Sequence, residues 1–433
     1  MKFSLTALLT LALAVTAIPT QDRANKTHDG TKVIRVAIPD SAESAARLQT
    51  LVGKLDLPLW SRNFLPNGVV DVQVPKEKIE AFEAASIEWK KDVMFEDLGK
   101  SIREEADGIA DEGMITISAD VGTAAAPDVT WFNSYHSYAD HLTWLNQMVA
   151  AYPNNAKIVT AGSSSQGRAI TGIHIYGSNP GTKPGVIIHG TVHAREWITT
   201  MTTEYMAWNL LTTKGSDSIV ASLLTKYDFY LFPVVNPDGF VYTQTNDRMW
   251  RKNRQSVSSS CYGVDINRNW ANKWSGSGSS TSPCSETYRG PSQGSTPEVQ
   301  GLAAFQNALS PKPKFYMDFH AYGQMWMFPY GYTCSANAPD HTELQSLSNG
   351  AVAALKAVSG TTYTAGPICK TIYAVNGDSV DYSYEVTGIK YSFTAELRPG
   401  SGSSTGFLLP AAQILPVGKE TWAAMRYLWN NMV

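Results

Sequence analysis

Long apolar runs that alternate with helical patterns constrain the fold of this chain more than any other sequence feature. Residues 186–193 form a nearly continuous apolar run, and a helical pattern follows at 196–211. Further buried strands are predicted at 229–235, 315–320 and 391–397. Buried strands separated by helices indicate an α/β fold with a mixed central sheet flanked by helices. We therefore expect functional side chains in the loops beyond the carboxyl ends of these strands.

Charge density divides the chain into two parts. Residues 18–112 contain 13 Lys and Arg and 18 Asp and Glu, whereas residues 113–433 contain 21 and 20 in more than three times the length. So sharp a change predicts two independently folded units. Residues 106–128 are rich in glycine and include an Ala-Ala-Ala-Pro run, which is typical of a linker.

The first unit is predicted to be a small α+β domain. Its pattern indicates strands at 32–38, 69–74 and 92–95, and helices at 41–52, 75–88 and, at the junction, 96–106. It contains no cluster of histidine, cysteine or serine that could carry out chemistry. The second unit must therefore hold the functional site.

The N-terminal residues predict export from the cell. Lys2 precedes an apolar run, and Val-Thr-Ala at 15–17 suits cleavage after Ala17, so residues 1–17 are interpreted as a signal peptide. A membrane anchor is the weaker alternative, because the run is shorter than the ~20 apolar residues that a span needs. We expect a secreted chain with no membrane association. The one N-glycosylation sequon, at Asn25, lies in the first unit.

Overall charge argues against nucleic acid as a partner. The formal net charge is −3, with 17% charged and 43% hydrophobic residues. A globular chain with so little net charge has no electrostatic attraction for nucleic acid or for an anionic membrane.

Two histidines and one glutamate form a candidate zinc site. His193 and Glu196 are spaced His-x-x-Glu after the first buried run, and His320 ends another. Three such ligands leave one position open, which is typical of catalytic zinc, whereas structural zinc takes four protein ligands. Taken alone, the tetrapeptide also fits a strand-end histidine followed by a carboxylate at a helix N-terminus.

Five motifs in this order identify a family resemblance, which runs from about residue 32 to the C-terminus. They are His-Ala-Arg-Glu-Trp at 193–197, Asn-Pro-Asp-Gly at 236–239, Arg-Met-Trp-Arg-Lys at 248–252, Val-Asp-Ile-Asn-Arg-Asn-Trp at 264–270 and Phe-Thr-Ala-Glu-Leu at 393–397. The chain resembles the secreted zinc carboxypeptidases of the pancreatic A/B type. The resemblance implies an inhibitory activation domain at 18–112 and a catalytic domain at 113–433. An activating protease would cut near 112–113.

The resemblance also implies roles at the zinc site. His193, Glu196 and His320 would hold one zinc ion, and Asp265 would accept the other ring proton of His193. Glu396 would be the general base that takes a proton from the attacking water and passes it to the leaving amine. Arg251 would face the scissile carbonyl and stabilise its developing negative charge.

Substrate recognition is implied by the same motifs. Asn267 and Arg268 would hold the terminal carboxylate, and Tyr373 would close over the substrate. The full substrate-binding set is Arg195, Asn267, Arg268, Tyr322, Tyr373, Asp378 and Val380. The sequence departs from the pancreatic enzymes at Ala321, the residue after His320, where they usually carry serine. This difference affects a contact that positions the substrate and leaves the zinc ligands unchanged.

Side-chain preference depends on the floor of the specificity pocket. The resemblance puts Val380 at the floor, with Met327, Ile368 and Thr394 as other uncharged wall positions. A buried unpaired ammonium or guanidinium is costly, so aromatic and aliphatic C-terminal residues are expected. Asp378 is either a solvated turn residue after Gly377 or a carboxylate that reaches the rim. In the second case Lys and Arg would also be accepted, giving a dual A/B-like specificity.

Four cysteines fit an oxidising compartment. They allow three pairings, and sequence neighbours favour Cys261–Cys284 and Cys334–Cys369. The first pair matches a bridge of the resembled family.

Three functions compete on these observations: a zinc exopeptidase made as a zymogen, a related amide hydrolase with another substrate, and a non-catalytic binding module. The presence of Glu396 disfavours a non-catalytic binding module. The residues expected to bind a terminal carboxylate disfavour an amide hydrolase with another substrate. The expected partners are protein and peptide C-termini and the activating protease, and the expected assembly is a monomer.

Overall fold

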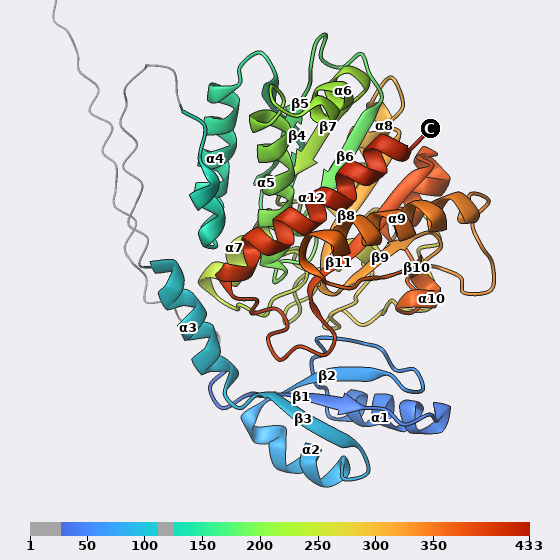
Figure 1. The fold of residues 1–433 in the computed structure, drawn as a ribbon. Helices are drawn as coiled ribbons and strands as arrows, with labels where there is room; N and C mark the ends of the chain where they lie inside the picture. The colour runs from blue at the N-terminus through green and yellow to red at the C-terminus, as the bar shows by residue number, and fades with distance from the viewer. Residues whose placement is uncertain (1–26, 111–124) are drawn as a thin grey trace, which may run out of the picture.

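Two separate hydrophobic cores divide the described residues, 27–110 and 125–433, into an N-terminal and a C-terminal unit in this computed structural model (Figure 1). The predicted signal peptide 1–17, the sequon at Asn25 and the predicted cut at 112–113 lie outside the described residues. The predicted linker at 106–128 is partly wrong, because helix α3 continues from Leu98 to Ala110.

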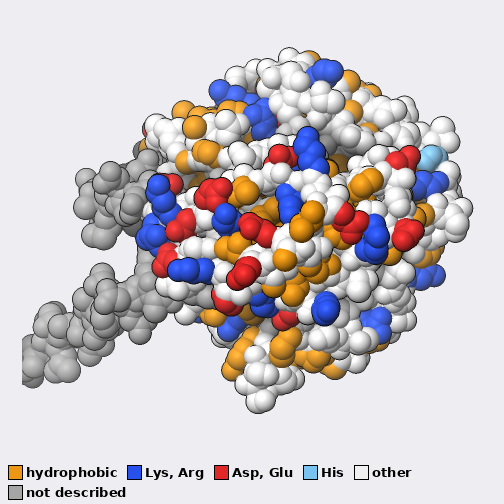
Figure 2. Space-filling view, turned by 90° about the horizontal axis from the view of Figure 1, so that it is seen from below, with side chains coloured by type: hydrophobic (Ala, Val, Ile, Leu, Met, Phe, Trp, Pro, Cys, Tyr) orange, Lys and Arg blue, Asp and Glu red, His pale blue; other side chains and the backbone are white. Residues whose placement is uncertain are grey.

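The N-terminal unit is the expected small α+β domain. Its antiparallel sheet has the order β2-β1-β3, and apolar side chains of α1 and α2 pack against it. The elements are β1 Lys32–Ala37, α1 Ala42–Lys54, β2 Val69–Val74, η1 Lys76–Lys78, α2 Ile79–Ala85, β3 Lys90–Phe95 and α3 Leu98–Ala110. The helix predicted at 75–88 is instead a 3₁₀ turn followed by a shorter α-helix. On the outer face of this unit basic and acidic side chains are interspersed (Figure 2).

The C-terminal unit is built on the predicted mixed sheet. Its eight strands have the order β10-β9-β11-β8-β6-β7-β5-β4, and the central four, β11, β8, β6 and β7, are parallel. The strands are β4 Ala156–Ser163, β5 Ala169–Ile175, β6 Gly185–His189, β7 Asp228–Phe232, β8 Phe315–Gly323, β9 Met325–Phe328, β10 Thr364–Pro367 and β11 Tyr391–Gly400. The strand predicted at 186–193 ends earlier, because Gly190 follows it and Thr191 has a φ of 56°.

Helices cover both faces of this sheet. Helices α5, α9 and α12 lie in front of it in Figure 1, whereas α8 lies behind and packs against β4. The longer helices are α4 Tyr138–Ala151, α5 Trp197–Thr212, α6 Ser218–Lys226, α7 Pro237–Thr245, α8 Pro297–Ala308, α9 His341–Ser359 and α12 Ile414–Asn431. The shorter ones are η2 Val129–Asn133, η3 Ile266–Arg268, α10 Ile368–Thr371, α11 Ser379–Tyr382, η4 Ser383–Thr387 and η5 Ala411–Gln413.

The two predicted disulfides, Cys261–Cys284 and Cys334–Cys369, are both formed. Both bridges fasten loops of the C-terminal unit. Within 27–110 and 125–433, no helix has the length and apolar character needed to cross a membrane.

A separate apolar cluster joins the two units. It combines Trp60, Leu98 and Ile102 of the N-terminal unit with Met249 and Phe407 of the C-terminal unit. The N-terminal unit is therefore packed against the end of the sheet where the predicted site residues lie (Figure 1).

Candidate metal centre and substrate pocket

His193, Glu196 and His320 converge at the carboxyl end of the sheet. His193 lies in the loop after β6, Glu196 is the N-cap of α5, and His320 is on β8. Nδ1 of His193 lies 2.8 Å from Oε1 of Glu196 and 3.0 Å from Nδ1 of His320. One ligand atom from each residue can be chosen so that all three lie within 4.8 Å of one another. All three side chains are buried.

Carboxylates hold the outer nitrogens of both imidazoles. Oδ1 of Asp265 lies 3.2 Å from Nε2 of His193, as the resemblance implies. Oδ2 of Asp318 lies 3.2 Å from Nε2 of His320. Such partners fix the ring orientation and turn both Nδ1 atoms inward. Sequence reasoning missed Asp318, although its place two residues before His320 on one strand puts both on the same face.

The arrangement of donor atoms fits a bound cation. Two imidazole nitrogens that face each other at 3.0 Å repel unless a proton or a metal ion lies between their lone pairs. Burial alone would raise the pKa of Glu196, but the neighbouring His193 and His320 outweigh it and hold that pKa below the ordinary value. A deprotonated carboxylate and two oriented imidazoles form a zinc-type donor set with one position left open.

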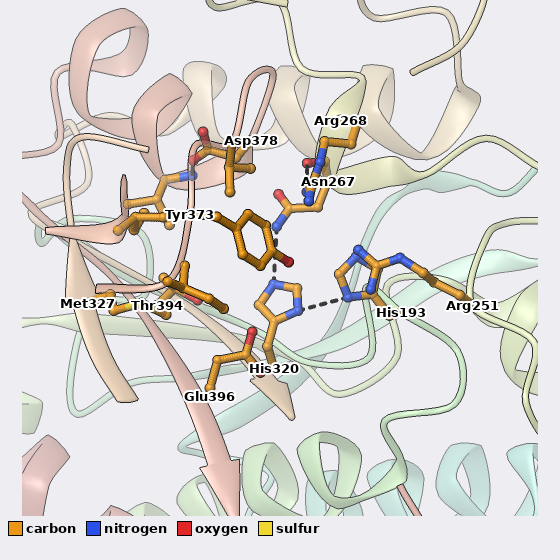
Figure 3. A pocket seen from close by; sticks show the side chains of 14 residues that line it. His193, Arg251, Asn267, Arg268, His320, Met327, Tyr373, Asp378, Thr394 and Glu396 are labelled. Carbon is orange, nitrogen blue, oxygen red and sulfur yellow. Dashed lines mark hydrogen bonds between the residues drawn. The ribbon is translucent and has the colours of Figure 1, made fainter. Parts of the chain in front are cut away.

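Glu396 and Arg251 lie beside this cluster. Glu396 on β11 is the register partner of His320 on β8, and both line the same pocket (Figure 3). Burial raises the pKa of Glu396 to about 8, so the group can exchange a proton near neutral pH. The guanidinium of Arg251 donates to Oδ2 of Asp265 over 3.0 and 3.2 Å, which fixes its position at the pocket wall.

The pair Asn267 and Arg268 lies on the turn η3 across the pocket from Glu396 (Figure 3). Oδ1 of Asn267 accepts from the backbone N–H of Ser379 at 2.9 Å. Arg268 donates from Nε to the carbonyl of Gly278 and from Nη1 to the carbonyl of Asn267, both at 2.8 Å. Its Nη2 has no hydrogen-bond partner among the described residues. Tyr373 extends into the pocket toward Asn267 and His320.

Deeper in the pocket the lining is mostly apolar. Val380, on α11, is buried and lines it together with Met327, Ile368 and Thr394. These positions are the ones that the resemblance implies.

The prediction that Asp378 is a solvated turn residue is wrong. It is only 2% exposed, and it caps α11 because its Oδ1 accepts from the backbone N–H groups of Val380 and Asp381 at 3.0 and 2.9 Å. Oδ2 accepts from no N–H group of the described residues, and it lies beside the carboxyl group of Asp381, whose pKa burial and the charge of Asp378 raise well above its ordinary value. Burial raises the pKa of Asp378. This buried carboxylate belongs to the pocket lining.

Arg195 and Tyr322 contact the N-terminal unit. Nη2 of Arg195 donates to the carbonyl of Leu59 at 3.2 Å, and the hydroxyl of Tyr322 donates to Oδ2 of Asp71 at 2.5 Å. Asp71 is also paired with Arg35 through two hydrogen bonds of 2.7 and 2.9 Å. Both expected substrate-binding residues are thus held by the unit that lies over the pocket. No sequence signal indicated these contacts, because they join residues far apart in the chain.

Two Gly-x-Ser-x-Gly sequences, at 290–294 and 402–406, do not form a serine-hydrolase site. Such a nucleophile lies on a sharp turn between a strand and a helix. Neither sequence lies on such a turn, and Ser292 and Ser404 are both exposed.

Comparison with known proteins gives a consistent result. A family model for zinc carboxypeptidases matches residues 141–424, and one for the carboxypeptidase activation peptide matches residues 36–105. A metallocarboxypeptidase A-like protein of Trichophyton verrucosum (strain HKI 0517) is 45% identical over 421 residues, covering 96% of each chain. Carboxypeptidase A2 of Rattus norvegicus is 36% identical over 414 residues, covering 94% of this chain and 95% of its own.

Solved structures agree with these matches. The crystal structure of thrombin activatable fibrinolysis inhibitor has a TM-score of 0.81 at 30% identity, covering 93% of this chain and 98% of its own. Carboxypeptidase A from Helicoverpa armigera has a TM-score of 0.80 at 29% identity, covering 92% and 97%.

Proposed function

Since the chain belongs to the zinc carboxypeptidase family and carries a carboxypeptidase activation peptide, we propose that it is a secreted zymogen whose mature form removes aromatic and aliphatic residues from protein and peptide C-termini. The observation that carries the proposed preference is the uncharged floor at Val380, below the buried cluster of His193, Glu196 and His320. We expect the mature enzyme to act as a monomer.

We assign the zinc ion to His193, Glu196 and His320. Bound zinc would act as a Lewis acid, polarising the scissile carbonyl and making the attacking water more acidic. Asp265 and Asp318 support this assignment, because each holds the outer nitrogen of one imidazole. The protein thereby fixes the tautomers before metal or substrate binds.

Substrate is positioned by its own terminal carboxylate. In the proposed complex Asn267 and Nη2 of Arg268 donate hydrogen bonds to that carboxylate, and Tyr373 moves over it and excludes water. An internal peptide segment has no terminal carboxylate that Asn267 and Arg268 could bind. Cleavage is therefore confined to the last peptide bond.

Proton transfer is assigned to Glu396. Its carboxylate takes a proton from the attacking water and later gives it to the nitrogen of the leaving residue, whose bond to the carbonyl carbon breaks. Arg251 donates to the carbonyl oxygen as negative charge develops there. Asp265 keeps the guanidinium in place, so no reorganisation is needed when the charge appears.

Latency is assigned to the N-terminal unit. Trp60, Arg62 and Asp71 line the same cavity as Glu396 and Tyr373, so an extended peptide would collide with this unit. Cleavage between the two units by another protease would allow the N-terminal one to leave. Full activity of the uncleaved chain would contradict this role.

Asp378 supports a second candidate, a dual specificity that also accepts C-terminal Lys and Arg. The specific observation is that this buried carboxylate belongs to the pocket lining and has no basic partner among the described residues there. An ammonium or guanidinium that reached it would gain a partner, whereas Val380 offers none.

Rates on peptides ending in Phe, Leu and Arg discriminate between the two candidates. We expect Phe and Leu to be removed fastest, because the floor is apolar. Replacing Asp378 with Asn retains a capping oxygen for α11 but removes the charge. A loss of Arg release in Asp378→Asn with unchanged Phe release would favour dual specificity, and Arg as the best terminus would contradict the preference assigned to Val380.

A further inference from the structure

The loop between α1 and β2 carries a cation into the mouth of the pocket. Its position is fixed at Trp60, whose ring packs at 5.2 Å from that of Phe407 and whose Nε1 donates to Oε1 of Gln73 at 3.1 Å. The next residue, Ser61, accepts from the backbone N–H of Asp71 at 2.9 Å. Arg62 follows directly from this anchored pair.

The guanidinium of Arg62 has no hydrogen bond or ion pair within the described part of the chain, although its backbone carbonyl accepts from the N–H of Phe64 at 2.9 Å. Its side chain is partly buried and lines a cavity of about 300 Å³ together with Arg251 and Tyr373. Tyr373 also lines the adjoining pocket that holds Arg268. Arg251 and Tyr373 line both, so Arg62 and Arg268 lie in two adjoining pockets on either side of Tyr373.

Four carboxylates line these two pockets beside the arginines, but Arg62 and Nη2 of Arg268 are not paired with any of them. Burial, and next the repulsion from Arg251, lower the pKa of the Arg62 guanidinium to about 10. Glu286 attracts this guanidinium but already pairs with Arg195 at 3.3 Å. Arg251 is likewise paired with Asp265, whereas Arg62 and Nη2 of Arg268 have no acidic partner.

A zinc ion at the proposed ligands would add further positive charge to these pockets. Asp71, Glu196 and Glu396 also line the cavity of Arg62. Asp71 is already paired with Arg35, and Glu196 would be neutralised by the metal that it binds. A buried guanidinium without a counter-charge is unfavourable, whereas a carboxylate supplies the charge and the geometry to pair with it.

We propose that Arg62 and Arg268 form an anion site in the uncleaved precursor, which takes a small dicarboxylate with one carboxylate on each guanidinium. The proposal rests on the assignment of Arg268 to carboxylate binding in the proposed function. Because Arg62 comes from the N-terminal unit, the site exists only while the two units are joined. A ligand that binds the joined form alone stabilises it by mass action, so a dicarboxylate would strengthen latency.

Calorimetric titration of the zinc-loaded precursor with succinate tests this site. Loss of one charge-assisted hydrogen bond weakens binding by about tenfold, so we expect Arg62→Gln to raise the Kd for succinate by about that factor. Arg62→Lys keeps the charge and should recover much of the affinity. The matched control is Arg47→Gln, because Arg47 lies on the exposed surface of the same unit, paired only with Glu88, and should leave the Kd unchanged.

Three outcomes would overturn the proposal. They are an Arg62→Gln precursor that binds succinate as tightly as the wild type, a precursor that does not bind succinate, and a mature enzyme that binds it as tightly as the precursor. Peptidase activity of the mature enzyme is measured in parallel. Its loss would refute the proposed function, whereas normal peptidase activity without an Arg62 effect would refute only the anion site.

Discussion

Glu105 offers the sharpest test of how the N-terminal unit is held in place. It lies on α3, and its Oε2 and Oε1 accept from Nε and Nη2 of Arg248 at 2.5 and 3.0 Å. The side chains are 12% and 3% exposed, so this ion pair between the units is largely shielded from solvent. We predict that Glu105→Gln raises the peptidase activity of the uncleaved precursor.

The magnitude follows from what Arg248 keeps after the change. Removing one partner of a buried ion pair costs about 3–5 kcal/mol when the other charge is left alone. Here Arg248 still donates to the carbonyls of Arg195 and Phe407, both at 2.9 Å, and the glutamine oxygen can accept one bond. We therefore expect a loss of about 2 kcal/mol, which raises the open fraction of the precursor about 30-fold.

The assay is release of C-terminal phenylalanine from a short peptide by the uncleaved precursor. Glu104→Gln is the matched control, because Glu104 lies next to Glu105 on α3 but is 63% exposed and only 3.7 Å from Lys100. Such a pair contributes little, so basal activity should not change. Equal basal activity in Glu105→Gln and wild-type precursors, with equal mature activities, would refute the reasoning.

Three further predictions concern the mature enzyme and its fold. His193→Ala and His320→Ala should each lose zinc together with activity, measured by metal analysis of purified protein, and full zinc occupancy in either would show that the ligand is misassigned. kcat/KM should fall as pH is lowered through the pKa of Glu396, because only the ionised carboxylate accepts a proton. Burial raises that pKa to about 8, whereas bound zinc lowers it. A pH profile of kcat/KM without an acidic limb between pH 4.5 and 8 would be inconsistent with Glu396 as the base. Cys284→Ser opens a bridge across 23 residues and should reduce the free energy of unfolding by about 3 kcal/mol in denaturant titrations, whereas an unchanged midpoint would contradict this.

Much of the sheet could be predicted because its central strands are buried on both faces and are therefore apolar throughout. The residues at which the strands end were harder to predict from the sequence. The first of them was predicted to reach His193 but ends at His189, since Thr191 takes a backbone conformation that an apolar pattern does not reveal. The zinc cluster was still predicted, because His193 and Glu196 are separated by only a short stretch of chain.

Residues that act through long-range contacts could not be predicted. Asp378 was expected either in solvent or at the rim of the pocket, and the first alternative is wrong, because packing by distant segments buries this cap of α11. Likewise the contacts of Leu59 with Arg195 and of Asp71 with Tyr322 join residues more than 130 positions apart. Neither charge pattern nor periodicity carries information about such pairs.

Product analysis of a mixed peptide library tests the central assignment most directly. The mature enzyme is incubated with the library, with and without a zinc chelator, and the released amino acids and shortened peptides are identified by mass spectrometry. We predict release of single C-terminal residues, mostly Phe, Tyr and Leu, that stops with the chelator and is absent in Glu396→Gln. Internal cleavage, or release of single residues that the chelator does not affect, would contradict a zinc carboxypeptidase built on His193, Glu196 and His320.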